Sequence, residues 1–287
     1  MVVAMSNKKY HRIKIALVVV AVAILTIAAG FLGWTRLARY AAFPEAVSLA
    51  STATTARGWY VFEAQPGAAN AESKTTRAAT GFIFYPGGLV DPRAYAPLMK
   101  KLADGGLTSI IVPMPLDLAV FNIGAADAVM AAYPNITRWI VGGHSLGGSM
   151  AAEFVARYFK RASTGRGTAP EQNAPPNQGS ASDRSAQPLE GLVFLASYSA
   201  KSTDLSSLPI RVLSIYGSND GVLSSEFANS MVRVPSGSNL VEIPGGNHAQ
   251  FGNYGPQKGD GTASISREAQ QERTSELILE FSNIVLK

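Results

Sequence analysis

Short apolar runs and amphipathic stretches alternate along most of this chain, and the alternation predicts strands and helices that follow one another. The β-rich runs are nearly continuous in apolar residues, as in strands that helices cover on both faces. Residues 93–104 instead carry apolar side chains at helical spacing and end before a Gly-Gly pair, a common helix stop. The expected strands are 57–63, 80–85, 107–113, 139–141, 189–196, 210–216 and 239–243, and the expected helices are 93–104, 125–133, 149–160, 222–229 and 264–286. The pattern therefore predicts an α/β fold built on a mostly parallel, doubly wound sheet.

The N-terminal region departs from this alternation with a run of twenty apolar residues, Ile15 to Trp34, that contains no charge. About 20 such residues span a bilayer, whereas the apolar core of a secretory signal has about 7–15. No small-x-small cleavage site follows directly, although Ala41-Ala42 lies further downstream. We therefore expect residues 1–36 to form a cytoplasmic flank and an uncleaved transmembrane signal anchor in contact with membrane lipid. A cleaved signal peptide, with a mature N-terminus near Phe43, is the alternative.

The charges around the apolar run predict its orientation. Four cations precede it and two follow it, namely Lys8, Lys9, Arg12 and Lys14 before, and Arg36 and Arg39 after. Because positive flanks are retained in the cytoplasm, this bias favours a single-pass protein with a cytoplasmic N-terminus and an extracytoplasmic C-terminal domain. A buried core helix is a poorer interpretation of the run, since only Thr26 would mark a solvent-facing side.

Beyond the anchor, we expect residues 37–56 to form a tether and residues 57–287 to form one domain, because this length suits a single α/β unit. The segment 162–188 is rich in Ser, Gly, Pro, Asn and Gln and contains no large apolar residue. A segment of this composition cannot offset its ordering entropy by burial, so we expect a disordered surface insert there.

The most informative local motif is Gly143-x-Ser145-x-Gly147, which follows an expected strand and precedes an expected helix. A serine on such a turn is a nucleophile elbow. The turn forces the serine into a strained backbone conformation, and a Cβ atom on either side would collide with the neighbouring strand or helix. In return, the serine hydroxyl is exposed at the tip of the sheet. The amide of Leu146 and the helix N-terminus face any oxyanion that forms there.

A serine hydroxyl needs a base to remove its proton, and the chain contains three histidines. His11 lies in the charged flank of the apolar run. His144 adjoins the serine, where its side chain points away from the hydroxyl. His248 follows the expected strand 239–243 and comes after the serine in the chain, as the Ser…Asp…His order requires. A loop histidine is ordinarily solvated or caps a turn, but elimination makes His248 the expected base.

Asp220 is the expected orienting acid, because it lies in the turn after strand 210–216. From there its carboxylate can accept a hydrogen bond from His248 and select the tautomer of the imidazole. The alternative role of Asp220 is to cap the helix expected at 222–229. Two other carboxylates compete for the acid's role: Asp204, after the preceding strand, and Asp183, in the expected insert.

Two further loops contain candidate binding groups. The Pro-Gly-Gly turn after strand 80–85 can present bare amides to an oxyanion, and the sequence does not choose between Gly88 and Leu89 as the donor. The glycine-rich stretch 251–261 follows His248 directly. Its polar side chains, those of Tyr254, Gln257 and Asp260, either line the acyl or leaving-group site or only close the fold before the last helix.

Together these blocks resemble the α/β-hydrolase superfamily, most closely the compact family often labelled α/β-hydrolase fold-5. The matching blocks are 84–92 with Tyr95, 113–119, 143–148, 217–221 and 246–252. They occur in the family's order and cover roughly residues 58–287. The resemblance implies the hydrolase fold and ester or related acyl chemistry, but no particular substrate. Lid domains of that fold usually follow the strand expected at 189–196, where only 197–208 stand here, so no lid is expected.

The function expected from these residues is a membrane-anchored serine hydrolase that acts on a small-molecule ester or acyl substrate. Ser145 attacks the carbonyl, His248 transfers the proton, and Asp220 stabilises the imidazolium. No metal or organic cofactor is needed, and without cysteine no Cys-based site is possible. The net charge of +5 comes partly from the anchor's flank, and no basic-aromatic cluster indicates nucleic acid. The alternatives are an acyltransferase with the same triad and a non-catalytic, membrane-tethered binding module.

Overall fold

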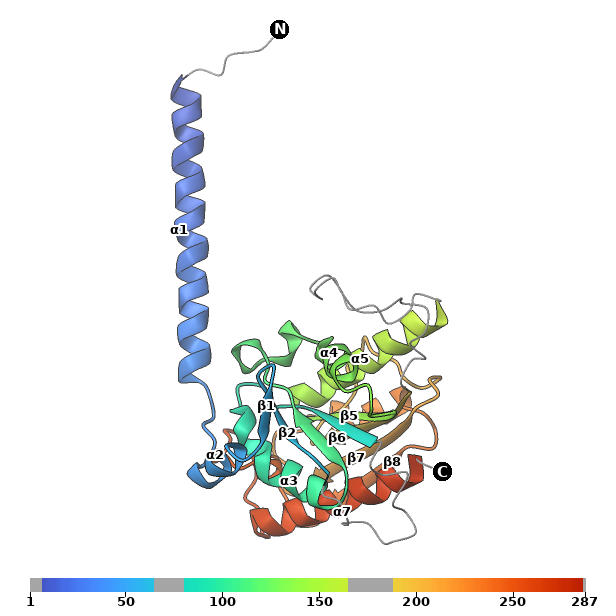
Figure 1. Ribbon diagram of the computed structural model, residues 1–287. Coiled ribbons are helices and arrows are strands. Elements are labelled where there is room, and N and C mark those ends of the chain that lie inside the picture. Colours follow the sequence, from blue (N-terminus) through green and yellow to red (C-terminus); the bar gives the residue numbers. More distant parts are fainter. Residues whose placement is uncertain (1–6, 65–79, 165–187, 286–287) are drawn as a thin grey trace. The chain divides into compact units, whose positions relative to one another are not determined.

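The computed structural model describes residues 7–64, 80–164 and 188–285, and for residues 7–10 the backbone alone (Figure 1). Residues 65–79 and nearly all of the expected insert, residues 165–187, lie outside the described residues. The chain divides into two compact units, Met1–Arg39 and Tyr40–Lys287, which we describe separately.

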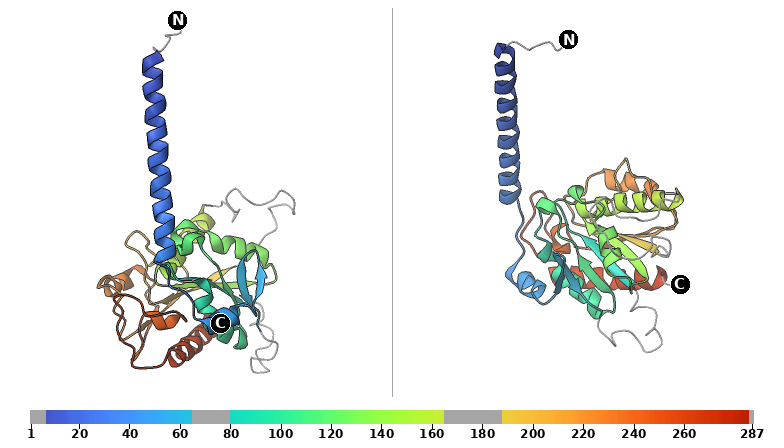
Figure 2. Two further views of the ribbon diagram at one scale, coloured as in Figure 1. Left: turned by 90° about the vertical axis from the view of Figure 1, so that its left-hand side faces the viewer. Right: turned by 45° about the horizontal axis from the view of Figure 1, so that its top comes forward.

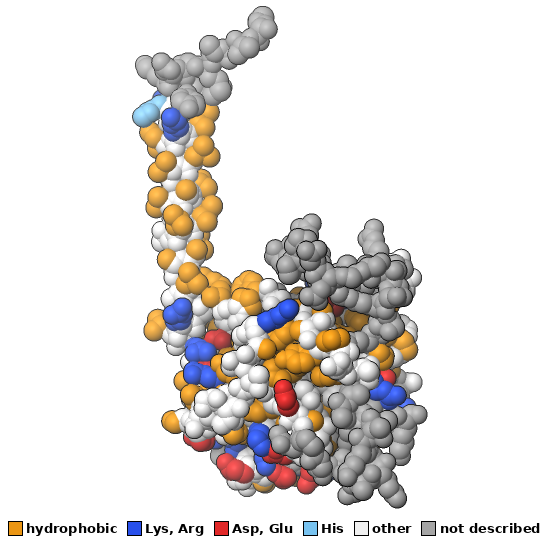
Figure 3. All heavy atoms as spheres, in the orientation of Figure 1, with side chains coloured by type: hydrophobic (Ala, Val, Ile, Leu, Met, Phe, Trp, Pro, Cys, Tyr) orange, Lys and Arg blue, Asp and Glu red, His pale blue; other side chains and the backbone are white. Residues whose placement is uncertain are grey.

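The first unit is a single long helix, α1 (Asn7–Leu37). Its segment His11–Leu37 has a mean hydropathy of 2.9 in its most apolar window, and none of that window is buried. Hydrophobic side chains accordingly cover the helix along most of its length (Figure 3). At about 1.5 Å per residue, its 27 residues exceed the roughly 30 Å of a bilayer's hydrocarbon core. The expected N-terminal apolar helix is thus present and long enough to span a membrane, although a signal sequence would meet the same criteria.

The second unit is built on an eight-stranded sheet in the order β1-β2-β4-β3-β5-β6-β7-β8. Strand β2 pairs antiparallel with both of its neighbours, β1 and β4. The five remaining pairs, from β4 through β3 to β8, are parallel, which confirms the predicted mostly parallel sheet. The strands are β1 (Thr54–Ala56), β2 (Trp59–Phe62), β3 (Thr80–Tyr85), β4 (Thr108–Ile111), β5 (Arg138–His144), β6 (Leu189–Leu195), β7 (Arg211–Gly217) and β8 (Asn239–Ile243).

Helices cover both faces of the sheet, as Figures 1 and 2 show for α5 and α7. The helices of this unit are α2 (Pro44–Ala50), α3 (Ala96–Asp104), α4 (Ala125–Ala132), α5 (Leu146–Ser163), α6 (Glu226–Ser230) and α7 (Arg267–Val285). Short 3-10 turns lie at Pro92–Tyr95, Pro115–Asp117, Ala119–Phe121, Met231–Arg233 and Ala249–Phe251.

Strand β3 shows how the sheet divides the core into two. Its side chains alternate, so that Phe82 and Phe84 pack in the core formed with α3 and α7. Ile83 and Tyr85 pack in the other core, with α4 and α5. The parallel strands all end at the same edge, so the loops after β3, β5, β6, β7 and β8 gather there. Residues 196–210, all of them described, contain no helix, so no lid domain stands at the place where lids of such folds usually insert.

The expected tether needs correction, because residues 37–56 contain both α2 and β1. Pro44 stands at the start of α2, a position that suits proline, and Ala46 and Ala50 are buried. Strand β1 pairs with β2, where Thr55 lies opposite Tyr60. The compact unit therefore begins at Tyr40 rather than at residue 57. Apolar contacts between short elements, too weak to see in the sequence pattern, order this segment.

Candidate active site

Ser145 lies at the carboxyl end of β5, directly before α5, with φ 51° and ψ −123°. This left-handed φ is the strained conformation that the elbow requires of a residue with a side chain. A Cβ atom on Gly147 would lie 2.2 Å from the Tyr85 carbonyl oxygen, and one on Gly143 would lie 2.5 Å from the Gly147 carbonyl carbon. Both contacts are too close for any Cβ, so both glycines are needed for the strand, turn and helix to pack.

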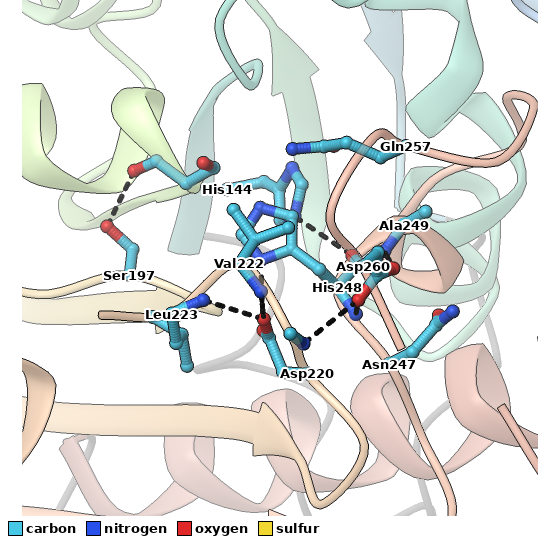
Figure 4. Close-up of polar contacts among 12 residues, drawn as sticks. His144, Ser197, Asp220, Val222, Leu223, Asn247, His248, Ala249, Gln257 and Asp260 are labelled. Carbon is cyan, nitrogen blue, oxygen red and sulfur yellow. Dashed lines mark hydrogen bonds and ion pairs between the residues drawn. The ribbon is translucent and has the colours of Figure 1, made fainter. Parts of the chain in front are cut away.

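His248 and Asp220 are hydrogen-bonded, with 2.9 Å between His248 Nδ1 and Asp220 Oδ2 (Figure 4). Their side chains are only 1% and 2% exposed. The other carboxylate oxygen of Asp220 accepts the amides of Val222 and Leu223 at 2.8 and 2.9 Å. Asp220 thus orders its own turn and also contacts the histidine. The helix expected at 222–229 begins only at Glu226.

The competing carboxylates are placed differently. Asp204 is exposed, and its carboxylate accepts the backbone amide of Ser206 at 2.9 Å. That hydrogen bond lowers the pKa of Asp204. Asp183 lies outside the described residues. Of the two candidates that the structure describes, Asp220 is the one that lies beside His248.

The second ring nitrogen of His248, Nε2, is buried and has no hydrogen-bond partner among the described residues. Because an ionised carboxylate only accepts, the proton of a neutral His248 resides on Nδ1 and the lone pair on Nε2. Ser145 therefore does not hydrogen-bond to Nε2 in this structure, as is common at catalytic pairs without substrate. An unpaired buried nitrogen costs about 1–3 kcal/mol of stability, which calls for a functional reason.

The loop after β3, residues 86–91, is called the oxyanion loop below. A Cβ atom on Gly88 would lie 3.0 Å from Leu146 Cδ2, so Gly88 is next to the first residue of α5. The amide of Leu146 belongs to a helical first turn, whose amides lack partners within the helix. Leu89 is different, because its amide donates to the Asp117 carbonyl at 2.8 Å. Of the two expected donors in this loop, Leu89 is thus already occupied, and Gly88 is the one beside Leu146.

A buried hydrogen-bonded chain links the oxyanion loop, the elbow and the loop that carries His248. The Gly87 amide donates to the Tyr95 hydroxyl at 3.1 Å, and that hydroxyl lies 2.8 Å from His144 Nδ1. His144 Nε2 lies 3.1 Å from the His248 carbonyl oxygen. A carbonyl only accepts, so Nε2 carries the proton and Nδ1 accepts the tyrosine O–H.

This arrangement needs His144 to be neutral. Burial and the nearby His248, whose ring centroid is 4.5 Å away, lower the pKa of His144 well below its usual value. The sequence indicated only that His144 points away from the serine. Its place in a buried strand is the signal that it needs polar partners, since an imidazole is rarely left unpaired in a core.

Asp260, one of the polar side chains in the stretch 251–261, has a role at the site that the sequence did not indicate. Its carboxylate accepts four backbone amides, those of Gly221, His248, Ala249 and Gly261, at 2.8–3.2 Å (Figure 4). Asp260 therefore joins the turn of Asp220 to the loop of His248. No sequence signal could have revealed this, because the stretch has no periodicity and its partners are backbone groups.

Two roles were open for Tyr254, lining the site and closing the fold, and its burial fits the second. This side chain is fully buried, and its hydroxyl donates to Gln257 Oε1 at 2.9 Å. Burial raises the pKa of Tyr254 well above its usual value, with smaller contributions from neighbouring tyrosines and carboxylates. Tyr254 is a core residue that orients Gln257 and not a lining of the substrate site. Gln257 is half-buried, and its contact with substrate stays a prediction.

Metal ligands do not gather anywhere in residues 7–64, 80–164 and 188–285, where no group of three or more His, Asp or Glu could hold an ion. The carboxylates beside His248, those of Asp220 and Asp260, both accept backbone amides. The groups at this edge of the sheet are a serine hydroxyl, an imidazole, a carboxylate and backbone amides. This is the set of groups that acyl transfer through serine uses.

A model of the Alpha/beta hydrolase family matches residues 81–164 and 178–272, more than half of the chain. The chain therefore belongs to this family, which confirms the resemblance seen in the sequence blocks. The match includes Ser145, Asp220 and His248.

Solved structures with the same fold include carboxyl esterase 2 from the mycorrhizal fungus Tuber melanosporum, at 12% identity and a TM-score of 0.50. That match covers 80% of this chain and 81% of that one. Est1E from Butyrivibrio proteoclasticus, solved with ferulic acid, has 13% identity, a TM-score of 0.49 and coverages of 79% and 97%. An esterase from Thermogutta terrifontis has 12% identity, a TM-score of 0.49 and coverages of 82% and 98%. No curated protein sequence matches significantly. At these identities the likeness concerns the fold alone.

Proposed function

We propose that this protein is a serine hydrolase that cleaves a carboxylic ester, or a related acyl bond, through an acyl-enzyme on Ser145. The observation that carries the proposal is the buried hydrogen bond from His248 to Asp220, with the opposite ring nitrogen unpaired. The strained turn at Ser145 also supports the proposal. Ser145 directly follows His144, the last residue of β5, and the ring of His144 packs against that of His248. Membership of the family supports hydrolysis in general, whereas the ester bond is inferred from the groups at the site.

The proposed mechanism follows from these groups. Ser145 Oγ attacks the substrate carbonyl carbon while His248 Nε2 accepts its proton, and Asp220 stabilises the resulting imidazolium. The amides of Leu146 and Gly88 stabilise the negative charge on the tetrahedral intermediate. The imidazolium then protonates the leaving alcohol, and the acyl group remains on Ser145. A water then attacks the acyl-enzyme while His248 takes its proton, and His248 returns that proton to Ser145 Oγ as the acid is released.

We also propose that α1 anchors the enzyme in a membrane as a single-pass helix, with the catalytic unit outside the cytoplasm. Its length and hydropathy support a membrane span, and the four cations before the apolar run against two after it support the orientation. The full-length protein should then resist carbonate extraction, and protease added to spheroplasts should digest the second unit. A protected second unit would contradict the orientation, and extraction by carbonate would contradict the anchor.

A fluorophosphonate probe tests the enzymatic proposal most directly. The full-length protein should be labelled at Ser145 and should hydrolyse a short p-nitrophenyl ester, whereas Ser145→Ala should do neither. Absence of labelling in the folded wild-type protein would contradict a serine hydrolase and favour a binding module. Product analysis with and without an added alcohol distinguishes hydrolysis from acyl transfer, because a transferase would form a new ester in place of the free acid.

A further inference from the structure

The first four residues of the catalytic unit, Tyr40–Phe43, lie between two loops of the candidate site. On one side they pair with the oxyanion loop. The Tyr40 amide donates to the Leu89 carbonyl at 2.7 Å, and the Asp91 amide donates to the Tyr40 carbonyl at 2.9 Å. These two bonds form a parallel bridge between Tyr40 and Val90. Tyr40 thereby holds the backbone directly after Gly88, where the Leu89 amide is also bonded to Asp117.

On the other side the same residues pair with the chain that follows His248. The Phe43 amide donates to the Asn253 carbonyl at 2.8 Å, and Ala42 forms an antiparallel bridge with Tyr254. The rings of Tyr40 and Tyr254 lie 5.7 Å apart. Four consecutive residues thus connect the loop of the expected oxyanion donor with the loop of the expected base.

Side chains reinforce this connection. The Tyr40 hydroxyl accepts the Lys258 amide at 3.4 Å, and the guanidinium of Arg267, at the start of α7, lies 4.8 Å above the Phe43 ring. Each backbone hydrogen bond contributes modestly to stability, so several of them together can hold a short segment in one position. An oxyanion donor must be placed within a few tenths of an ångström of its target to be effective.

We propose that Tyr40–Phe43 is a positioning segment of the active site, which holds the oxyanion loop in register with the loop of His248. The inference rests on the proposed serine hydrolase function. It has a consequence for processing of the N-terminus. Cleavage after Ala42, the position of a cleaved signal peptide, would remove Tyr40 and with it both bonds to the oxyanion loop. The active enzyme therefore retains Tyr40, and a cut that preserves activity lies before it.

Specific cleavage of the folded, full-length protein tests this segment. A protease recognition sequence is inserted between Arg39 and Tyr40 in one variant and between Phe43 and Pro44 in a second. Cutting the first leaves Tyr40–Phe43 on the catalytic unit, and ester hydrolysis should stay within about 2-fold of the uncut sample. Cutting the second and washing away the N-terminal fragment should lower kcat about 10-fold or more with little change in KM, because oxyanion stabilisation acts on the transition state. The rate of fluorophosphonate labelling should fall in parallel.

A third variant keeps the chain intact. Tyr40→Pro removes the N–H that the Leu89 carbonyl accepts, and it should lower kcat and the labelling rate in the same direction. Thermal unfolding of Tyr40→Pro and of the cut proteins shows whether a loss of activity comes from a local change or from a loss of overall stability. Equal activity after the two cuts, or an unchanged kcat in Tyr40→Pro, would overturn the proposal. Failure of the proposed function has a different signature, because Ser145→Ala would then remain active.

Discussion

The nucleophile elbow and the loop that carries His248 meet at the same edge of the sheet, but they keep their shapes by different means. The elbow is shaped by its own residues, since Gly143, Gly147 and the left-handed φ of Ser145 lie within five positions. The histidine loop has no such local constraint. It is held by side chains 28, 12 and 104 positions away in the chain, those of Asp220, Asp260 and His144.

The difference teaches that a short motif can specify the position of the proposed nucleophile, whereas the position of the proposed base depends on residues distributed over the chain. A substitution of Ser145 should therefore remove the reaction of its own hydroxyl. Changes around the histidine should act through contacts remote from the serine, with effects that decline as the contact becomes less direct. The substitutions below test this comparison from both sides.

The largest effects are expected at Ser145 and His248 themselves. Ser145→Ala and His248→Ala should each lower kcat for a short p-nitrophenyl ester on the order of 10³-fold or more, and the double variant should be scarcely worse than either. Circular dichroism should show an intact fold, and His11→Ala in α1 serves as the control. Substantial activity in either single variant would contradict the serine hydrolase assignment.

Asp220→Asn should rank next. The amide keeps the side chain's size but can donate to His248 Nδ1, which selects the wrong tautomer, so kcat should fall about 10²–10⁴-fold with little change in KM. Asp204→Asn is the matched control, because this carboxylate is exposed and hydrogen-bonds to Ser206. If Asp204→Asn were the damaging change, the acid would lie after β6 and not after β7.

Asp260→Asn should have an intermediate effect. An amide group would place N–H donors against some of the four backbone amides that the carboxylate now accepts, which loosens the loop of His248 from the turn of Asp220. We expect kcat to fall about 10–100-fold and hydrogen exchange at His248 and Ala249 to accelerate. Asp104→Asn, on the exposed end of α3, should leave both unchanged. Normal kinetics in folded Asp260→Asn would show that the loop keeps its position without this carboxylate.

Substitutions of two buried tyrosines distinguish an effect on the stability of the fold from an effect on the position of the site residues. Tyr95→Phe removes the hydroxyl between Gly87 and His144, and Tyr85→Phe removes one between Ala126 and Ile123. Each loss should destabilise the fold by about 1–3 kcal/mol in urea unfolding. Only Tyr95→Phe should also lower kcat, by roughly 10-fold, since its partners belong to the site. Equal kinetic effects in the two variants would mean that the tyrosine of the site acts through stability alone.

The smallest effect is a dependence of stability on pH. The pKa of His144 is lowered by folding, so the unfolded chain binds a proton below about pH 6.5 that the folded protein excludes. Stability is therefore complete above that pH and should decrease on acidification, with a limiting slope of about 1.4 kcal/mol per pH unit. In urea unfolding between pH 7 and 5, His144→Gln should show a shallower slope than the wild type. An equal slope in both would mean that another group dominates in this range.

Several features were readable in the sequence because their causes are local. Strands buried on both faces produce continuous apolar runs, so seven of the expected strands correspond to β2 through β8. The elbow at Ser145 was readable because backbone crowding demands glycine at 143 and 147. The helix α1 could be predicted because its apolar run is long and contains no charged residue. Elimination then indicated His248, and the chain order indicated Asp220.

The tertiary structure alone decided the rest. Residues 40–56 form α2 and β1 and include the pairing of Tyr40 with the oxyanion loop. The Leu89 amide donates to the Asp117 carbonyl, and Tyr254 is buried. The tertiary structure also brought Asp260 to the backbone around His248 and joined Tyr95 to His144. The physical reason is the range of the interactions. Backbone sterics and hydrophobic periodicity act between neighbours in the chain, and so they leave a local pattern. A polar side chain in a loop finds its partner only when the sheet has brought distant loops to the same edge.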